Sequence, residues 1–331
     1  MQGYTHFFSI AYSATDVAIY QQDVVIHRSK GTSYEETVGD FRVWHVYIGD
    51  RCKPDYGDIR FTDASGNALD YYLWPDYDAE SARFTVRLEG ADAAGVLQVW
   101  YGKLTATTTS DGDAVGYCDA FSEISEAWDT SGVETATIVD GRLKTTGIAD
   151  TWESYKTASV KRPVSIPYAF SAEVDLEYVA IPFCLGKLFL VVETSSSFTA
   201  AGYHDIDSIV AGGFSYILNG GSEVFSGKRT RPIDGKMHLQ ITRDASNTIK
   251  IYENGDIRAT GTMGGDITAI GLTNIRFKTY AGNIAYWDNL VVRAYSATPP
   301  AATAFAGAEP APEALHHVQG VVFGSANMMV I

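Results

Sequence analysis

The chain has 331 residues and a formal net charge of -15, and its 46% hydrophobic and 20% charged residues are typical of a folded protein. The negative charge argues against binding of nucleic acid through its phosphates, which requires basic patches. Twenty tyrosines and 31 glycines favour strands and tight turns, so the composition predicts an all-β protein.

The first residues, MQGYTHFFSIAYS, contain neither a basic segment nor a long apolar one, so we expect no signal peptide in them. No run of 18 apolar residues occurs, and we expect no membrane span. The three cysteines, Cys52, Cys118 and Cys184, lie far apart without a Cys-x-x-Cys or Cys/His spacing. This pattern does not predict a zinc site, and buried free thiols are the favoured interpretation.

Shifts in composition divide the chain into two units. Residues 1–104 form the first, and the polar segment 105–116 (TATTTSDGDAVG) reads as a linker. Residues 117–297 form the second. Residues 298–331 combine a Pro/Ala-rich spacer with an apolar C-terminal tail.

Period-2 alternation dominates both units. In order along the chain, ARFTVRLEG (82–90), AFSAEVDLEYV (169–179), MHLQITRD (237–244) and NIRFKTYAG (274–282) all alternate apolar and polar residues. TIKIYENGDIRATGT predicts a hairpin with Asn254-Gly255 as a type I′ turn. Strand signals recur roughly every 8–12 residues, which predicts two β-sandwich domains in series.

The stretch GDIRFTDASGNALDYYLW (57–74) predicts a strand, a turn and a strand, with Ile59, Phe61 and Leu69 facing a core. Its turn residues, Asp63 to Asn67, can bond their own backbone, and Gly66 can take a positive φ. Together with LQVWYG (97–102), this stretch resembles domain-of-unknown-function family 2341. The resemblance implies a β-sandwich from microbial, archaeal surface or viral proteins, with no established chemistry.

The second unit resembles the concanavalin A-like (laminin-G-type) jelly rolls. The resemblance is carried by DAFSEISEAWDTSG, by HLQITRDASNTIKIYENGDIRATG and by the closing YWDNLVVRAY. It implies a jelly-roll fold whose members mostly bind glycans, sometimes bind proteins, and in a minority hydrolyse polysaccharides.

Alternation places Glu173, Asp175 and Glu177 on one face of a strand. Retaining glycosidases use two carboxylates roughly 5–5.5 Å apart, and jelly-roll β-glucanases carry an E-x-D-x-(x)-E motif that these residues resemble. However, no tryptophan lies within the neighbouring twenty residues, and a solvated acidic strand face is the commoner explanation. A hydrolase using Glu173 and Glu177 is therefore kept as an alternative, and we expect no enzyme.

Two further sets of residues are candidates for ligand binding. Resemblance to jelly rolls with a structural calcium suggests that Asp119 and Asp288 share a Ca²⁺ ion, although calcium needs six to eight oxygens. Sugar binding requires aromatic faces beside amides and acids. The candidates in or beside predicted loops are Trp152, Tyr155, Tyr203, His204 and Tyr280.

These features favour a non-enzymatic glycan-binding or adhesion protein. We expect a component of a prokaryotic or archaeal virus particle, such as a tail, fibre or receptor-binding protein, located in the virion or at a cell surface. Its expected partners are a cell-surface glycan or other polysaccharide, other virion subunits and further copies of itself in a homo-oligomer. A purely structural assembly or decoration protein is the remaining alternative.

Overall fold

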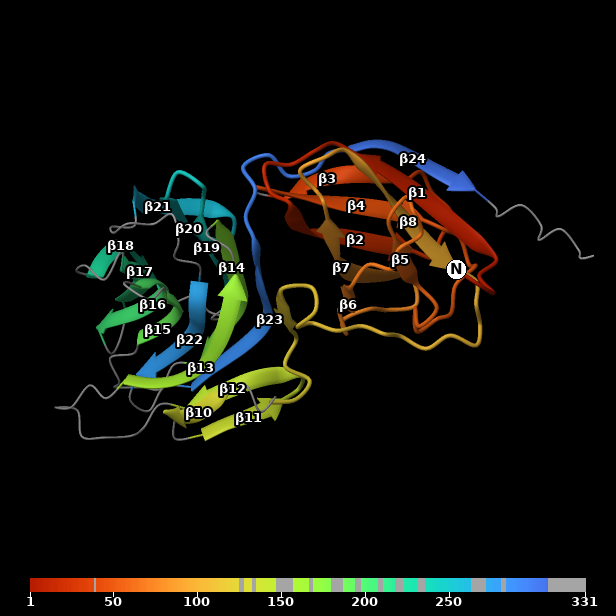
Figure 1. Ribbon diagram of the computed structural model, residues 1–331. Helices are drawn as coiled ribbons and strands as arrows, with labels where there is room; N and C mark the ends of the chain where they lie inside the picture. The colour runs from red at the N-terminus through yellow and green to blue at the C-terminus, as the bar shows by residue number, and fades with distance from the viewer. Residues whose placement is uncertain are drawn as a thin grey trace, which may run out of the picture.

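The structure is a computed structural model in which twenty-four strands are assigned (Figure 1). It describes residues 1–308 except 39, 125–127, 133–134, 147–156, 167–168, 180–186, 194–197, 208–210, 218–222, 231–235, 263–271 and 281–283. No helix long and apolar enough to cross a membrane occurs within these described ranges. The strands form two β-sandwiches, which confirms the predicted all-β, two-sandwich architecture.

The first sandwich packs a four-stranded sheet against a five-stranded one. The four-stranded sheet has the order β24 (Ala302–Ala308), β1 (His6–Tyr12), β8 (Gly95–Tyr101), β5 (Arg60–Thr62). The five-stranded sheet has the order β3 (Tyr34–Val38), β4 (Phe41–Tyr47), β2 (Ile19–His27), β7 (Ser81–Glu89), β6 (Tyr71–Leu73). Fully buried Trp44, Phe61 and Phe84 lie in the core between them, because alternate side chains of each strand point inward.

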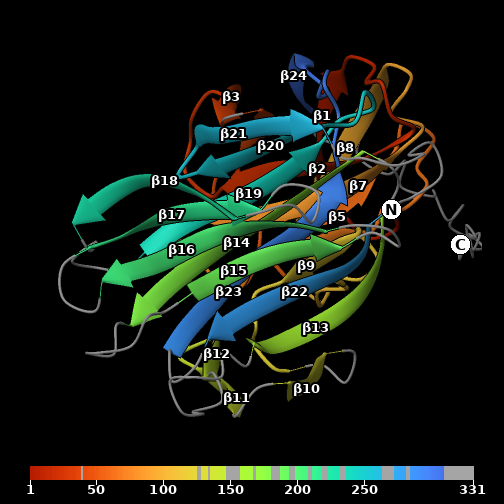
Figure 2. The ribbon, with the colours of Figure 1, turned by 90° about the vertical axis from the view of Figure 1, so that its left-hand side faces the viewer.

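The second sandwich packs a seven-stranded sheet against an eight-stranded one. The seven-stranded order is β10 (Asp129–Gly132), β13 (Thr157–Ile166), β22 (Leu272–Tyr280), β15 (Lys187–Glu193), β16 (Phe198–Asp207), β17 (Ala211–Ile217), β18 (Glu223–Thr230). The eight-stranded order is β11 (Thr135–Val139), β12 (Arg142–Thr146), β23 (Ile284–Ala294), β14 (Phe170–Val179), β19 (Lys236–Arg243), β20 (Thr248–Glu253), β21 (Asp256–Thr262), with β9 (Tyr117–Asp119) also paired to β23. Figure 2 shows the seven-stranded sheet in front of the other.

The chain returns to the first sandwich after the second. Ala302–Ala308 forms β24, which pairs antiparallel with β1 and adds Phe305 to the first core. The prediction that this part of segment 298–331 is a spacer is therefore wrong. Alanine-rich composition suggests a linker, but small side chains also suit an edge strand that rests flat on its neighbour. The predicted apolar tail, from residue 309 onward, lies outside the described residues.

The stretch 57–74 forms a tight turn, closed by a Thr62–Ala68 bridge and by the hydrogen bond from the Leu69 N–H to the Phe61 carbonyl, and its two strands then separate. Its first strand, β5, pairs with β8 in one sheet, while its second, β6, pairs with β7 in the other. The turn between them has the predicted chemistry: the Asp63 carboxylate accepts hydrogen bonds from the backbone N–H groups of Ser65 and Asn67, and Gly66 has a φ of +84°. The stretch is thus a corner that carries the chain from one sheet to the other.

Segment 105–116 is bound along the first sandwich. The Lys53 ammonium donates to the Ala106 carbonyl, and the Ser110 hydroxyl accepts from the Leu73 N–H. Val115 is buried with Trp74 and Val291 in a small apolar cluster between the sandwiches. The sequence predicts a polar linker here, and in the structure this segment makes fixed contacts with the first sandwich. The two sandwiches are therefore connected by the chain and also by side chains that pack between them.

Candidate functional site

The outer face of the eight-stranded sheet is polar at its centre. Every second side chain of β14 is buried in the core between the two sheets: Ala172, Val174 and Leu176. Glu173, Asp175 and Glu177 consequently lie on the opposite face, which is turned toward the first sandwich (Figure 1). The predicted acidic row exists, and its surroundings decide what each acid does.

A β-bulge in β23 adds two more polar side chains to this face. Glu173 pairs with Val291 but Asp175 pairs with Asp288, so β23 has one extra residue between them. The extra residue is Asn289, whose φ of +52° is rare for a side chain other than glycine. Since Trp287 and Leu290 are both buried in the core, Asp288 and Asn289 project outward together. Bulges of this kind re-aim side chains and occur often beside functional sites.

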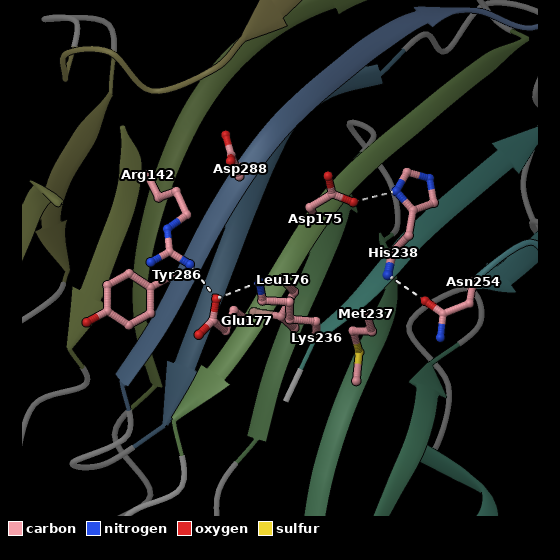
Figure 3. Close-up of a pocket in the computed structure, with 10 residues that line it drawn as sticks. All are labelled: Arg142, Asp175, Leu176, Glu177, Lys236, Met237, His238, Asn254, Tyr286 and Asp288. Carbon is pink, nitrogen blue, oxygen red and sulfur yellow. Dashed lines mark hydrogen bonds and ion pairs between the residues drawn. The ribbon is translucent and has the colours of Figure 1, made fainter. Parts of the chain in front are cut away.

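Three neighbouring strands bring Asp288, Asp175 and His238 to one pocket of about 280 Å³. Asp288, Asp175 and His238 lie opposite one another across β23, β14 and β19. Figure 3 shows the pocket with its lining side chains. The lining residues are Arg142, Asp175, Leu176, Glu177, Lys236, Met237, His238, Asn254, Tyr286 and Asp288.

His238 bridges two of the acids. Its Nδ1 lies 2.8 Å from an oxygen of Asp175, and its Nε2 lies 3.5 Å from an oxygen of Glu173. Burial alone would lower the pKa of His238, but the hydrogen bonds and charges of these two carboxylates raise it to about 9. Burial opposes ionisation of Asp175, yet the hydrogen bonds from His238 and Asn289 lower its pKa. At neutral pH the centre of the pocket holds a histidinium and an ionised aspartate.

Asp288 has the opposite shift. Its carboxylate accepts the N–H of Asn289 at 2.8 Å. Burial raises the pKa of Asp288 to about 6, and the neighbouring charge of Asp175 adds to the effect. Two facing carboxylates in one pocket thus differ in protonation: Asp175 is ionised, while Asp288 gains a proton in mildly acidic solution.

Glu173 is part of the contact between the sandwiches. Its side chain forms an ion pair with Arg293, whose guanidinium also reaches Asp23 of the first sandwich at 3.1 Å. Burial alone would raise the pKa of Glu173, but the charges of Arg293 and His238 lower it to about 2. Glu173 is 7% exposed. Its carboxylate is held at the interface between the sandwiches by Arg293.

Glu177, at the other end of the row, is neutralised separately. It pairs with Arg142, and Lys236 lies 3.8 Å away. The Arg142 guanidinium in turn lies 4.6 Å from the centre of the Tyr286 ring. The alternative hydrolase pair, Glu173 and Glu177, therefore consists of two carboxylates that are each held by a different arginine.

Asp119 and Asp288, the predicted calcium ligands, have different surroundings. The Asp119 carboxylate accepts hydrogen bonds from the Tyr117 hydroxyl, the Phe121 N–H and the Trp128 indole N–H. These donors occupy the oxygens that an ion needs. Within the described part of the chain, no group of three or more His, Cys, Asp or Glu side chains could hold a metal. The shared calcium stays a prediction.

Two of the five residues predicted to bind a glycan lie outside the described residues, and the other three lie in strands. Trp152 and Tyr155 are not described. Tyr203 and His204 belong to strand β16, and Tyr280 ends strand β22, so none of these three is in a loop. The structure places their backbones in the seven-stranded sheet, on the other side of the sandwich from the pocket.

Sequence reasoning missed five polar or aromatic residues of the pocket lining as ligand-binding candidates: Arg142, Lys236, His238, Asn254 and Tyr286. One signal was present. In YWDNLVV (286–292) the apolar residues Trp287, Leu290 and Val292 change phase after Trp287, as they do at a bulge. Arg142, Lys236 and His238 lie on strands, and Asn254 lies in the turn between two strands; the order of these strands in the sheet cannot be predicted from a single sequence.

Comparisons with known proteins found one matching family and several solved structures with distant similarity. Residues 55–133 match the family described as "Domain of unknown function (DUF2341)". No curated protein matches the chain. Similar solved structures include the CBM2 module of an evolved Dit protein from Lactobacillus casei BL23 phage J-1 (12% identity, TM-score 0.41, 54% of this chain and 94% of that one). Another is a Bacillus licheniformis β-glucanase (11%, 0.38, 54% and 98%). A third is the carbohydrate-binding module CBM66 from Bacillus subtilis (14%, 0.35, 51% and 96%).

The family match begins inside the first sandwich and continues through segment 105–116 into the second. It confirms the predicted family resemblance and extends past residue 104, the predicted end of the first unit. At such low identities and TM-scores the solved structures carry no argument about a ligand or an activity. Any inference about a ligand therefore rests on the residues that line the pocket.

Proposed function

We propose that this protein binds a glycan in the pocket on the outer face of strands β23, β14 and β19. The observation that carries the proposal is the bulge at Asp288 and Asn289, which sets two adjacent polar side chains beside Asp175. A positive φ at a residue other than glycine costs energy and persists only where the surrounding structure holds it. Such residues cluster at binding sites, and Asn289 is one of them.

The lining has the mixture that a sugar requires. Carboxylates and amides accept and donate hydrogen bonds to hydroxyl groups, and an aromatic ring packs against sugar C–H groups. Asp175, Asp288 and Asn254 supply the first kind, while Tyr286 supplies the second. The volume of about 280 Å³ is close to the lower end of the range of about 300–1,000 Å³ for small-molecule pockets.

A glycan array followed by calorimetric titration tests this proposal. Tyr286→Ala is expected to weaken binding by about tenfold or more, because the sugar loses its aromatic contact. Tyr77→Ala is the matched control, since Tyr77 is exposed in the first sandwich and lines neither this pocket nor the cleft beside it. Equal affinity of both variants, or no binding of any glycan by the wild type, would contradict the proposal.

Glycoside hydrolysis is a second candidate, supported by the opposite pKa shifts of Asp288 and Asp175. In this scheme the bond between the anomeric carbon and the glycosidic oxygen breaks, and Asp288 gives its proton to that oxygen, which leaves as a hydroxyl group. Asp175 takes a proton from a water molecule, whose hydroxyl forms the new bond to the anomeric carbon. Reducing-sugar release that disappears in Asp288→Asn would favour hydrolysis. Binding without release would favour the non-enzymatic function.

We further propose that the glycan is a host surface polysaccharide and that the protein acts in a virus particle or at a cell surface, with other subunits and as a homo-oligomer. This setting is supported by the family resemblance of the first sandwich, which implies microbial, archaeal surface or viral proteins. A purely structural role is its alternative. Light scattering tests the homo-oligomer, and antibody labelling of particles in the electron microscope tests the location. An oligomer that binds no glycan would favour the purely structural role.

A further inference from the structure

A second and larger cleft of about 610 Å³ adjoins the pocket, and both sandwiches line it. The first sandwich contributes Asp23, Val38, Phe41, Val43 and Arg83. The second contributes Glu173, Asp175, His238, Gln240, Asn254, Gly255, Asn289, Val291 and Arg293. Asp175, His238 and Asn254 line both the pocket and the cleft, so the two spaces adjoin at these residues.

The two walls of the cleft are fixed relative to each other. Buried Arg293 pairs with Glu173 of its own sheet and with Asp23 of the first sandwich, and its guanidinium lies 4.1 Å from the centre of the Phe41 ring. A second contact joins the two sandwiches: the Tyr252 hydroxyl of the second donates to the Asp40 carboxylate of the first at 2.5 Å. Breaking a buried ion pair is costly, so these contacts keep the width of the cleft constant.

The charges that line the cleft cancel. Three carboxylates, those of Asp23, Glu173 and Asp175, face the two guanidinium groups of Arg83 and Arg293 and the histidinium of His238. A charged ligand would meet no net charge of opposite sign here. An uncharged ligand finds hydrogen-bonding side chains together with apolar ones, and Val38 is 53% exposed.

We propose that the pocket and the cleft form one composite groove for an extended, uncharged oligosaccharide, in which the first sandwich contacts the sugar units beyond the one held in the pocket. This inference rests on the proposed glycan-binding function. The pocket holds one end of the chain beside Tyr286, and Val38 and Val43 offer apolar contacts along the cleft. The first sandwich is then part of the binding site and sets the length of chain that binds best.

The test compares chain lengths in the wild type and in one wall variant. The probes are β-1,3- and β-1,4-linked glucose and β-1,4-linked N-acetylglucosamine oligosaccharides from disaccharide to hexasaccharide, with oligogalacturonates as the charged counterpart. In the wild type the hexasaccharide of the bound uncharged series is expected to bind about tenfold more tightly than its disaccharide. Oligogalacturonates of equal length are expected to bind more weakly.

Val38→Arg places a long charged side chain on the cleft wall at an exposed position, so the fold should persist. It is expected to remove the gain with chain length, because the added side chain occupies the cleft, and to weaken hexasaccharide binding much more than disaccharide binding. Leu104→Arg adds the same charge at a residue that is 74% exposed and lines neither space, and it should change nothing. A length gain that survives Val38→Arg, or no length gain in the wild type, overturns the composite groove alone. No binding of any probe overturns the proposed function with it.

Discussion

Arg293 offers the sharpest test of how the two sandwiches are held together. The variant Arg293→Met keeps much of the side-chain volume but leaves the carboxylates of Asp23 and Glu173 buried without their shared cation. The pKa of Glu173 lies at about 2, against 4.5 for a free glutamate, which corresponds to stabilisation of the ionised form on the order of 3 kcal/mol. Removing one partner of a buried ion pair typically costs about 3–5 kcal/mol. We therefore expect Arg293→Met to lower the free energy of unfolding by about 3–5 kcal/mol at pH 7.

The pH dependence separates charge from packing. The folded-state pKa of Glu173 is depressed, so its stabilising contribution is complete above pH 4.5 and is lost as the pH falls from 4.5 to about 2. The difference in stability between wild type and Arg293→Met should consequently shrink over this interval, because the variant has little of this contribution to lose. Urea unfolding followed by tryptophan fluorescence at several pH values measures the difference. If it stays constant from pH 7 to pH 3, the cost comes from lost packing and our electrostatic account is wrong.

A surface ion pair supplies the matched control. Arg87 pairs with Glu89, and their side chains are 31% and 56% exposed. Exposed pairs contribute about 0–1 kcal/mol. Arg87→Met should therefore lower the free energy of unfolding by less than about 1 kcal/mol, with little dependence on pH.

Three further predictions follow from the site and from the C-terminal strand. Because burial raises the pKa of Asp288 to about 6 and an ionised carboxylate accepts hydrogen bonds more strongly, glycan affinity should fall as the pH drops through 6. In Asp288→Asn calorimetric titrations should show no such step, and a step that persists would assign it to another group. Phe305→Ala should lower the stability of the first sandwich by about 1–2 kcal/mol, since Phe305 is partly buried against its core; an unchanged urea midpoint would mean that β24 contributes nothing. Asn254→Ala should lower stability by about 1 kcal/mol, because Asn254 has a φ of +52° and its side-chain oxygen accepts a hydrogen bond from the backbone N–H of His238. A higher melting temperature of this variant would contradict the prediction.

Local patterns predicted those features that depend on neighbouring residues. Asn254 and Gly255 both have positive φ, as a type I′ turn requires, and Asp63 organises its own turn. The alternation of β14 correctly placed Glu173, Asp175 and Glu177 on one face. These features follow from steric and hydrogen-bonding rules that act over a few residues.

Features that depend on distant partners were missed. The alternation around residues 57–74 is the same for a hairpin as for a corner between sheets, because both need one buried face. β24 is recognisable only through its partner β1, nearly three hundred residues earlier. The surroundings of the three acids of β14 likewise depend on residues of other strands. Arg293 pairs with Glu173, Arg142 pairs with Glu177, and His238 pairs with Asp175.

The crystal structure of the protein with a hexasaccharide selected on a glycan array is the most direct test of the central claim. Our account predicts sugar rings against Tyr286, hydroxyl groups bonded to Asp175 and Asp288, and further units in the cleft beside Val38. Sugar bound on the seven-stranded sheet, near Tyr203 or Tyr280, would contradict it and would restore the aromatic residues that the sequence first suggested.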